Sequence, residues 1–431
     1  MNQVTAAIKK IFTAFNKTQH YCVAYSGGID SHVLLHALVQ HKPASSQLRA
    51  IHIHHGLQIA ADEWVEHCTE QARSLNVPLE IKYVDAKAAK GKSPEASARE
   101  ARYAALAEMM TEGEVLLTAH NQNDQAETVF LQLLRGAGVK GLAAMPAQSE
   151  FNSGILYRPL LNISRAEIAE YAHEQQLSWV EDPSNDNTHY DRNFLRQKIM
   201  PLLAERWPSF AQTVARSAQH CAEASALIEE VAEQDLVKVN GLILDLTPSV
   251  LPIKALLSLT IARQCQVIRH WLVQQQFPVP STTQMESLFR DLIHAAEDKK
   301  PLMQWPGVEI RRFKGYLFAM LPLSPFDSSL EIEWDGRTPL LLPADLGVLN
   351  PDDPRLLTIK PTLATTKSCI IRFRRGGETL RIPERKGTHE LKKLFQEWGV
   401  LPWRRDRVPL MHINGEMVLV LLSEKDAYLG G

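Results

Sequence analysis

The sequence predicts an α/β protein that begins with a doubly wound parallel sheet of the Rossmann-like kind, followed by a mostly helical middle domain and a small α+β C-terminal domain. Three observations predict this order. Apolar runs alternate with helical patterns over about the first 200 residues, helical patterns then dominate up to residue 296, and the last ~65 residues mix short strands with one helix. We place the domains at 1–208, 209–325 and 366–431, with a linker at 326–365 that is rich in Pro, Asp and Ser.

The first domain alternates apolar runs with helical periodicity. An amphipathic helix is expected over residues 1–15. Short apolar runs predict buried parallel strands at 20–25, 48–53, 79–84 and 114–118. Helical periodicity predicts helices at 31–41, 61–76, 94–111, 123–135, 164–176 and 193–206, of which the fifth begins with the capping box Ser164-Arg165-Ala166-Glu167. This alternation places a ligand crevice at the carboxyl ends of the strands.

The rest of the chain shows fewer chemical features. The middle domain is expected to contain helices at 209–237, 254–275 and 282–296, and then a hairpin that turns at Lys314-Gly315. The C-terminal domain is expected to contain strands at 368–374, 409–413 and 416–422 and a helix at 388–398.

Composition narrows the function classes. The 431 residues carry a net charge of −2, and the five cysteines include no C-x-x-C pair, which argues against disulfide, zinc and iron–sulfur frameworks. No apolar run approaches the ~18 residues that span a bilayer, and the N-terminus lacks the apolar core of a signal peptide, so we expect a cytoplasmic protein without membrane contact.

The most informative motif follows the first predicted strand. Its glycines allow backbone N–H groups to approach an anion, its serines add hydroxyl donors, and its aspartate can hold Mg²⁺ beside a phosphate. The motif comprises Ser26, Gly27, Gly28, Ile29, Asp30 and Ser31. It is not a Walker A loop, because the only Gly-Lys-Ser, at 91–93, has Ala86 where that loop requires glycine. The alternative is an ordinary strand-to-helix turn, but the arrangement resembles the PP-loop of N-type ATP pyrophosphatases, which use ATP and release pyrophosphate.

Two further strand ends carry polar residues. His120 follows the fourth strand, and Asp124 and Glu127 share one helix face at spacing i, i+3, where they can bind an ammonium group or a metal. The ordinary preference of acids for a helix N-terminus is the alternative. The second strand ends in HIHHGL. Its histidines alternate in direction and do not favour a metal site, so we place Ile53 beside the adenine instead.

Arginines and lysines suggest phosphate contacts. The candidates in the first domain are Arg102, Arg135, Arg192 and Arg196, whereas Arg99 is better explained as a surface ion pair. The basic loop 87–94 either covers a nucleic-acid substrate or is simply solvated. Residues 367–407 contain 12 Lys and Arg against 5 Asp and Glu, which indicates a nucleic-acid patch or a solvated charged face.

Several motifs occur together in one order: SGGIDS, HIHHGL, SPEASAREARY, AHNQNDQAET, LLRGAG, RPLL and EDPSNDNTHYDRNFLR. Together with the tail from Arg374 to Asp406, this set resembles the bacterial tRNA(Ile)-lysidine synthetases. One departure is that Asn121 and Asn123 stand where related PP-loop enzymes often carry His or Asp, which argues against a metal role for these two positions.

The resemblance implies a reaction and its components. ATP adenylates the wobble cytidine of the CAU anticodon of isoleucine tRNA, pyrophosphate leaves, and L-lysine then displaces AMP to form lysidine. It implies catalytic roles for Asp30, His120, Asp124 and Arg192, with the SGGIDS loop and Ile53 on ATP, and Mg²⁺ on Asp30. Substrate binding falls to Asp124, Glu127, Arg102, Arg135, Arg196, Arg374, Lys392 and Arg404. The oligomeric state stays open, with a homodimer as one alternative.

Two other functions compete with this interpretation. A tRNA thiolase also uses a PP-loop, but it needs a sulfur relay, and the cysteines here are far apart. A non-catalytic protein in which ATP only gates RNA binding would not need His120, Asp124 and Glu127. Release of AMP and pyrophosphate would separate an enzyme from such a binding protein.

Overall fold

The structure is a computed structural model, and its chain divides into two compact units, Met1–Leu227 and Ile228–Gly431. The residues described are 2–15, 20–54, 61–84, 94–181, 183, 187–240, 250–295, 301–344, 346–365, 368–382 and 387–423. Within these residues, no helix combines the length and the apolarity that crossing a bilayer requires.

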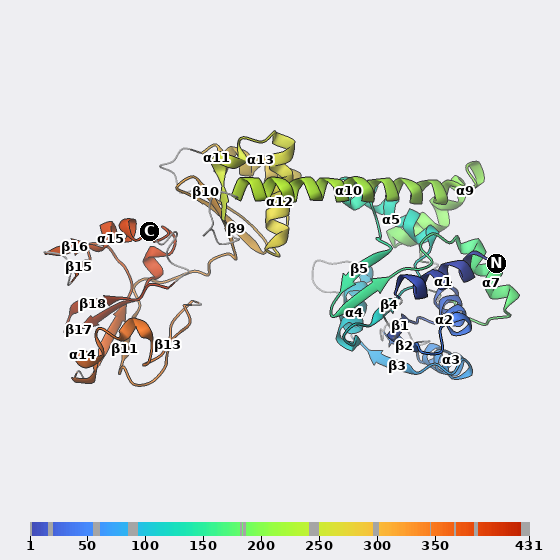
Figure 1. Ribbon diagram of the computed structural model, residues 1–431, viewed down its shortest axis with the longest axis horizontal. Helices are drawn as coiled ribbons and strands as arrows, with labels where there is room; N and C mark the ends of the chain where they lie inside the picture. Colours follow the sequence, from blue (N-terminus) through green and yellow to red (C-terminus); the bar gives the residue numbers. More distant parts are fainter. Residues whose placement is uncertain are drawn as a thin grey trace. The chain divides into compact units, whose positions relative to one another are not determined.

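A six-stranded sheet forms the centre of the first unit, in the order β3-β2-β1-β4-β6-β5 (Figure 1). The strands are β1 (His20–Ala24), β2 (Gln47–His54), β3 (Leu79–Tyr83), β4 (Val115–Leu117), β5 (Gln148–Phe151) and β6 (Gly154–Tyr157). The four predicted parallel strands are confirmed, and β6 extends the sheet in parallel beside β4. The sequence analysis missed β5, which pairs antiparallel with β6 at the edge.

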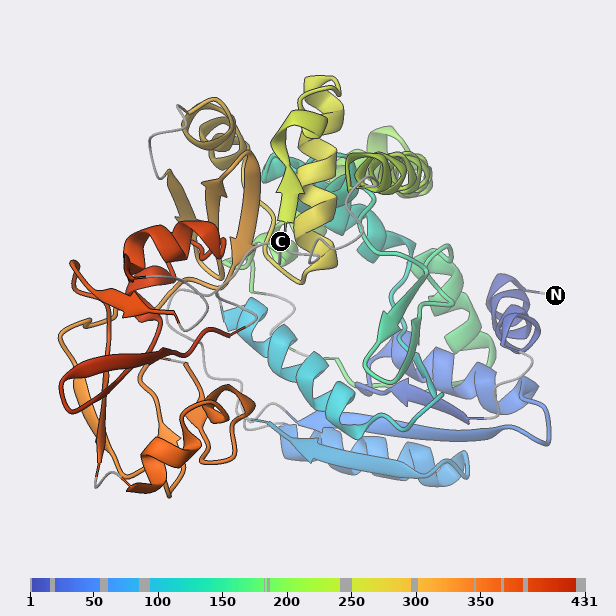
Figure 2. The same ribbon diagram turned by 60° about the vertical axis from the view of Figure 1, so that its left-hand side comes forward.

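Helices cover both faces of this sheet, as the doubly wound prediction requires (Figure 2). The helices are α1 (Gln3–Ala14), α2 (Ile29–His41), α3 (Ala61–Ser74), α4 (Pro94–Met109), α5 (Gln122–Leu134), α6 (Val139–Leu142) and α7 (Arg165–Glu174). Side chains of α1, α2 and α7 pack against Tyr21 and Val23 on one face. Leu106 of α4 packs with Cys22 and Ile51 on the other, because successive strand residues point to opposite sides.

The predicted helix at 193–206 consists of three parts. These are α8 (Asp191–Phe194), a π-helical turn (Leu195–Ile199) and α9 (Met200–Arg206). The long helix α10 (Phe210–Asn240) follows, and the division between the two units falls within it, so the boundary expected at 208 is not where the compact units separate. Leu236 and Val239 near its end contribute to the core of the second unit.

The second unit contains a sheet that the sequence analysis did not predict in full. Helices α11 (Ile253–Leu256), α12 (Ile261–Gln274) and α13 (Thr282–Ser287), with a π-helical turn (Leu288–Ile293), share one core with a four-stranded sheet. Its strands are β7 (Val250–Pro252), β8 (Leu302–Trp305), β9 (Val308–Phe313) and β10 (Tyr316–Met320), in the order β7-β10-β9-β8. The hairpin at Lys314-Gly315 is confirmed as the turn between β9 and β10.

The segment 326–365 is not a linker but part of the folded C-terminal module. Its strand β11 (Glu331–Trp334) pairs with β14 (Cys369–Arg372), and Leu349 and Leu356 are buried in the same core as Ile371. The sheet continues through β17 (Leu410–Ile413) and β18 (Glu416–Val420), in the order β11-β14-β17-β18. The module also contains β12 (Leu340–Leu341), β13 (Val348–Leu349), α14 (Lys360–Thr365), β15 (Thr379–Arg381), β16 (Thr388–Glu390) and α15 (Leu391–Glu397).

Candidate active site

The SGGIDS loop leads directly from β1 into α2. Gly27 has φ +83°, and a Cβ atom there would lie 2.7 Å from the buried Cys68 Sγ, so this position requires glycine. The Ser31 hydroxyl donates to the Gly28 carbonyl over 3.0 Å and accepts from the Ser26 backbone N–H over 3.2 Å. The loop is therefore held by its own side chains, with the N-terminus of α2 behind it as an anion-binding group.

Asn121 connects this loop to the end of β4. Its side-chain oxygen caps α5 by accepting from the backbone N–H groups of Asn123 and Asp124, at 2.9 and 3.0 Å. Its side-chain Nδ2 donates to Asp30 Oδ1 over 3.1 Å. A single amide thus orients the Asp30 carboxylate and the first turn of α5 together. The sequence analysis missed this role, although the capping box that Asn121 forms with Asp124 is a recognisable signal.

Four charged side chains form a closed cluster between α5 and the segment 191–199. Arg192 donates to Asp124 Oδ1 over 2.9 Å and to Glu127 Oε2 over 2.8 Å. Arg196 donates to the same Asp124 oxygen over 2.9 Å and to Glu127 Oε1 over 2.7 Å. The predicted shared face of Asp124 and Glu127 is therefore present. Both carboxylates already accept from guanidinium groups, and Arg192 and Arg196 are not free cations awaiting a phosphate.

Burial controls the protonation of the groups around this cluster. It raises the pKa of Asp30 to about 6, and the negative charge of Asp124 adds to the effect. It also lowers the pKa of His120 to about 3, so this imidazole is neutral at physiological pH and hydrogen-bonded to the Thr118 hydroxyl at 3.0 Å. Burial alone would raise the pKa of Asp124, but the positive charges of Arg192 and Arg196 hold it below its ordinary value.

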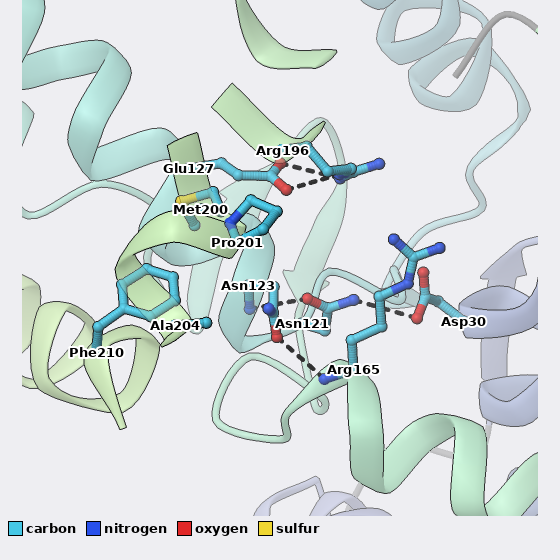
Figure 3. A pocket seen from close by; sticks show the side chains of 10 residues that line it. All are labelled: Asp30, Asn121, Asn123, Glu127, Arg165, Arg196, Met200, Pro201, Ala204 and Phe210. Atoms are coloured by element: carbon cyan, nitrogen blue, oxygen red, sulfur yellow. Dashed lines mark hydrogen bonds and ion pairs between the residues drawn. The ribbon is translucent and has the colours of Figure 1, made fainter. Parts of the chain in front are cut away.

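A cavity of about 210 Å³ lies between these groups and the start of α10 (Figure 3). Its polar lining consists of Asp30, Asn121, Asn123, Glu127, Arg165 and Arg196. Its apolar lining consists of Met200, Pro201, Ala204 and Phe210. No sequence signal marked this apolar side, because nothing in the residue spacing shows which face of α9 meets α5.

A second group of cations lies on α4 and after β6. The guanidinium groups of Arg99 and Arg102 lie 5.0 and 5.7 Å from the ring centre of Tyr103. Arg158 is buried and donates to the Pro146 carbonyl over 2.7 Å. Burial lowers the pKa of both Arg102 and Arg158, and Arg99 lowers each further by charge repulsion. An anionic ligand would relieve this repulsion.

The structure does not bring every predicted residue to this site. The side chain of Ile53 is buried in the core with Leu106 of α4, which leaves its backbone groups for the expected contact with the nucleotide. Arg135 is exposed and caps the far end of α5, roughly 16 Å along the helix from Asp124. His52 donates from Nδ1 to the Tyr25 carbonyl over 2.9 Å, which is a structural role, and His55 lies outside the described residues.

The C-terminal candidates form a separate group on the second unit. Arg374 donates to Asp406 Oδ1 over 2.9 Å, Lys392 is exposed on α15, and Arg404 is half-buried. The predicted loop 87–94 lies almost entirely outside the described residues. Among the residues that are described, no group of three or more His, Cys, Asp and Glu side chains could hold a metal ion.

This loop, sheet and cavity define a PP-loop protein, and the family comparisons agree. Residues 1–203 match the family model of the PP-loop domain. Residues 251–318 match a TilS substrate binding domain, and residues 369–426 match a TilS substrate C-terminal domain.

Curated relatives match over nearly the whole chain. The tRNA(Ile)-lysidine synthase of Coxiella burnetii is 44% identical over 96% of this chain and 90% of its own length. Those of Methylococcus capsulatus and Alkalilimnicola ehrlichii are each 42% identical over 93% of this chain, covering 90% and 88% of their own lengths. The chain belongs to the tRNA(Ile)-lysidine synthase family.

Proposed function

We propose that this protein attaches L-lysine to the wobble cytidine in the CAU anticodon of isoleucine tRNA, with ATP as co-substrate. The observation that carries the proposal is the placement of a preformed PP-loop beside a small cavity that carries two carboxylates and two guanidinium groups. The sequence similarity to enzymes named tRNA(Ile)-lysidine synthase indicates which substrates are used.

In the first step, the carbonyl oxygen of the cytosine attacks the α-phosphorus of ATP, and pyrophosphate leaves. Negative charge develops on the phosphate oxygens, which the N–H groups at the start of α2 and the hydroxyls of Ser26 and Ser31 stabilise. Asp30 fits a magnesium ion shared with the phosphates, because its carboxylate is half-buried beside the loop and accepts a hydrogen bond from the neutral Asn121 amide. Bound there, the ion would neutralise phosphate charge.

In the second step, the amine of lysine forms a bond to the activated carbon and AMP leaves. Because the reference pKa of this amine is ~10.4, it must lose a proton before it attacks. Glu127 lines the cavity and Asp124 lies behind it, so we assign the ammonium group to this acidic pair, where it shares the carboxylate oxygens with Arg192 and Arg196. His120 and Asp30 are the two candidates to accept the proton.

The basic side chains complete the proposal. Arg102 on α4 would bind phosphate near the anticodon, since its burial and the repulsion from Arg99 favour an anionic partner there. On the second unit, Arg374, Lys392 and Arg404 would bind the tRNA backbone by charge.

A single reaction tests the proposal. Purified protein is mixed with ATP, Mg²⁺, radiolabelled lysine and isoleucine tRNA with a CAU anticodon, and methionine tRNA with the same anticodon is the control. We expect label in the isoleucine tRNA only, together with AMP and pyrophosphate. AMP formation with a different amine or RNA would support the PP-loop chemistry but contradict the assignment of lysine and isoleucine tRNA as the substrates. Nucleotide binding without turnover would favour the non-catalytic alternative.

Reversing the charge of Lys392 tests the C-terminal contact. Lys392→Glu should weaken tRNA binding several-fold and reduce the slope of log K against log salt by about one, because one phosphate contact is lost. ATP affinity should not change. Lys10→Glu, which reverses an exposed lysine on α1, is the matched control and should leave both constants unchanged. Loss of ATP binding in Lys392→Glu would instead assign this residue a structural role.

A further inference from the structure

The cavity beside the PP-loop has a polar wall and an apolar wall, and Figure 3 labels the side chains of both. The polar wall carries Asp30, Glu127, Arg165 and Arg196. The apolar wall consists of Met200 and Ala204 on α9 and Phe210 at the start of α10, with Pro201 beside them. A ligand that satisfies both walls has charged groups of both signs and an apolar part.

The size of the cavity limits the class of ligand. Sites for drug-sized ligands have volumes of about 300–1,000 Å³, and this cavity of about 210 Å³ is smaller. It therefore suits a free amino acid better than a nucleotide, which would extend over the adjacent loop. Two carboxylates and two guanidinium groups match the mixed charges of a zwitterion.

Arg165 adds to this match. Its backbone N–H donates to Asn123 Oδ1 over 3.1 Å, which fixes the start of α7 beside the cavity. Within the part of the chain that the structure describes, its guanidinium group forms no salt bridge, although its positive charge acts to lower the pKa of the nearby Asp30, whereas Arg196 is paired with Asp124 and Glu127. The cavity thus has one cation that is paired within the charged cluster and one that lies near Asp30 without a salt bridge and can also contact the carboxylate of a ligand.

We propose that the wall of Met200, Ala204 and Phe210 selects the amine substrate by the length of its methylene chain. This inference rests on the proposed function, and it assigns specificity to side chains that carry no chemistry themselves. The aliphatic part of lysine packs along this wall, while its charged groups contact the polar wall. Burial of methylene groups against apolar side chains is favourable, and one methylene group in such a pocket changes kcat/KM by about 10-fold or more.

Ala204→Leu tests the wall by filling it. Amine transfer to isoleucine tRNA is measured with the full-length protein for lysine and for ornithine, which is one methylene group shorter. We expect the KM for lysine to rise at least 10-fold, the KM for ATP to stay constant, and the ratio of kcat/KM for lysine over ornithine to fall about 10-fold. Phe210→Leu, which shortens the wall conservatively, should shift the same ratio even if Ala204→Leu folds poorly.

The control is Leu202→Ala, which changes an exposed residue of the same helix outside the cavity and should alter neither constant. If the ratio is unchanged in both wall variants while the wild type still transfers lysine, the role of the wall in selecting the amine is contradicted and the proposed function stands. A raised KM for ATP with an unchanged ratio of lysine to ornithine would show that the wall contacts the nucleotide, and this result would also contradict its role in selecting the amine. Absence of lysine transfer in the wild type would overturn the proposed function and this inference together.

Discussion

Replacing Gly27 by alanine is expected to abolish ATP-dependent turnover and to destabilise the first unit by about 2–5 kcal/mol. Two physical causes add. The φ of +83° disfavours any residue with a Cβ, and the new methyl group would lie 2.7 Å from Cys68 Sγ in a buried, close-packed position. The measurement is the free energy of unfolding in urea, combined with the rate of pyrophosphate release.

The neighbouring glycine provides the matched control. A Cβ at Gly28 would lie 3.6 Å or more from its nearest neighbours, and its φ is −73°, so Gly28→Ala should keep its stability within about 0.5 kcal/mol. Its pyrophosphate release should still fall about 10²–10³-fold, because the methyl group crowds the N–H groups that bind phosphate. The double variant Gly27→Ala/Cys68→Ala should recover only that part of the lost stability which the contact with Cys68 Sγ causes. Full stability of Gly27→Ala would contradict this account of the loop.

Removing the carboxylate of Glu127 should also have a large effect. This side chain is 1% exposed and accepts three hydrogen bonds from Arg192 and Arg196. Glu127→Ala leaves two guanidinium groups with one carboxylate partner, and breaking a buried ion pair in this way costs about 3–5 kcal/mol. Lysine transfer should be lost as well. The control Glu63→Gln removes an exposed charge on α3 and should change neither quantity.

A double variant separates stability from function at this position. Glu127→Leu with Arg196→Met replaces both partners by apolar side chains, which is often neutral for stability. We expect its free energy of unfolding to return toward that of the wild type, while lysine transfer stays at the level of Glu127→Ala. Recovery of transfer together with stability would show that the cluster only supports the fold and does not bind the ammonium group.

The elements that carry the loop could be predicted because their causes are local. Hydrophobic runs and turn residues located β1, β2, β3 and β4 to within about one or two residues, since a buried parallel strand needs a continuous apolar run. The glycine and serine residues of the SGGIDS motif predicted the turn that leads into α2. The shared face of Asp124 and Glu127 followed from helical spacing alone.

The partners of these side chains could not be predicted in the same way. Arg192 and Arg196 lie 65 to 72 residues after the carboxylates that they bind, so their contact depends on how the segment 191–199 packs on α5. The prediction that 326–365 is a linker was wrong for the same reason. The Pro, Asp and Ser content there is typical of a linker, but β11 finds its hydrogen-bonding partner in β14 only after the chain has folded back.

The sequence by itself determined the PP-loop, the alternation of strands and helices that presents it, and the family to which the motifs belong. These follow from residue types at short spacing, whose physical preferences act within a few residues. Tertiary structure alone decided which charges neutralise one another, that Ile53 packs into the core, and that Met200, Ala204 and Phe210 line the same cavity as Asp30 and Glu127. Such choices depend on packing between distant segments, and side-chain periodicity within one segment does not specify its neighbour.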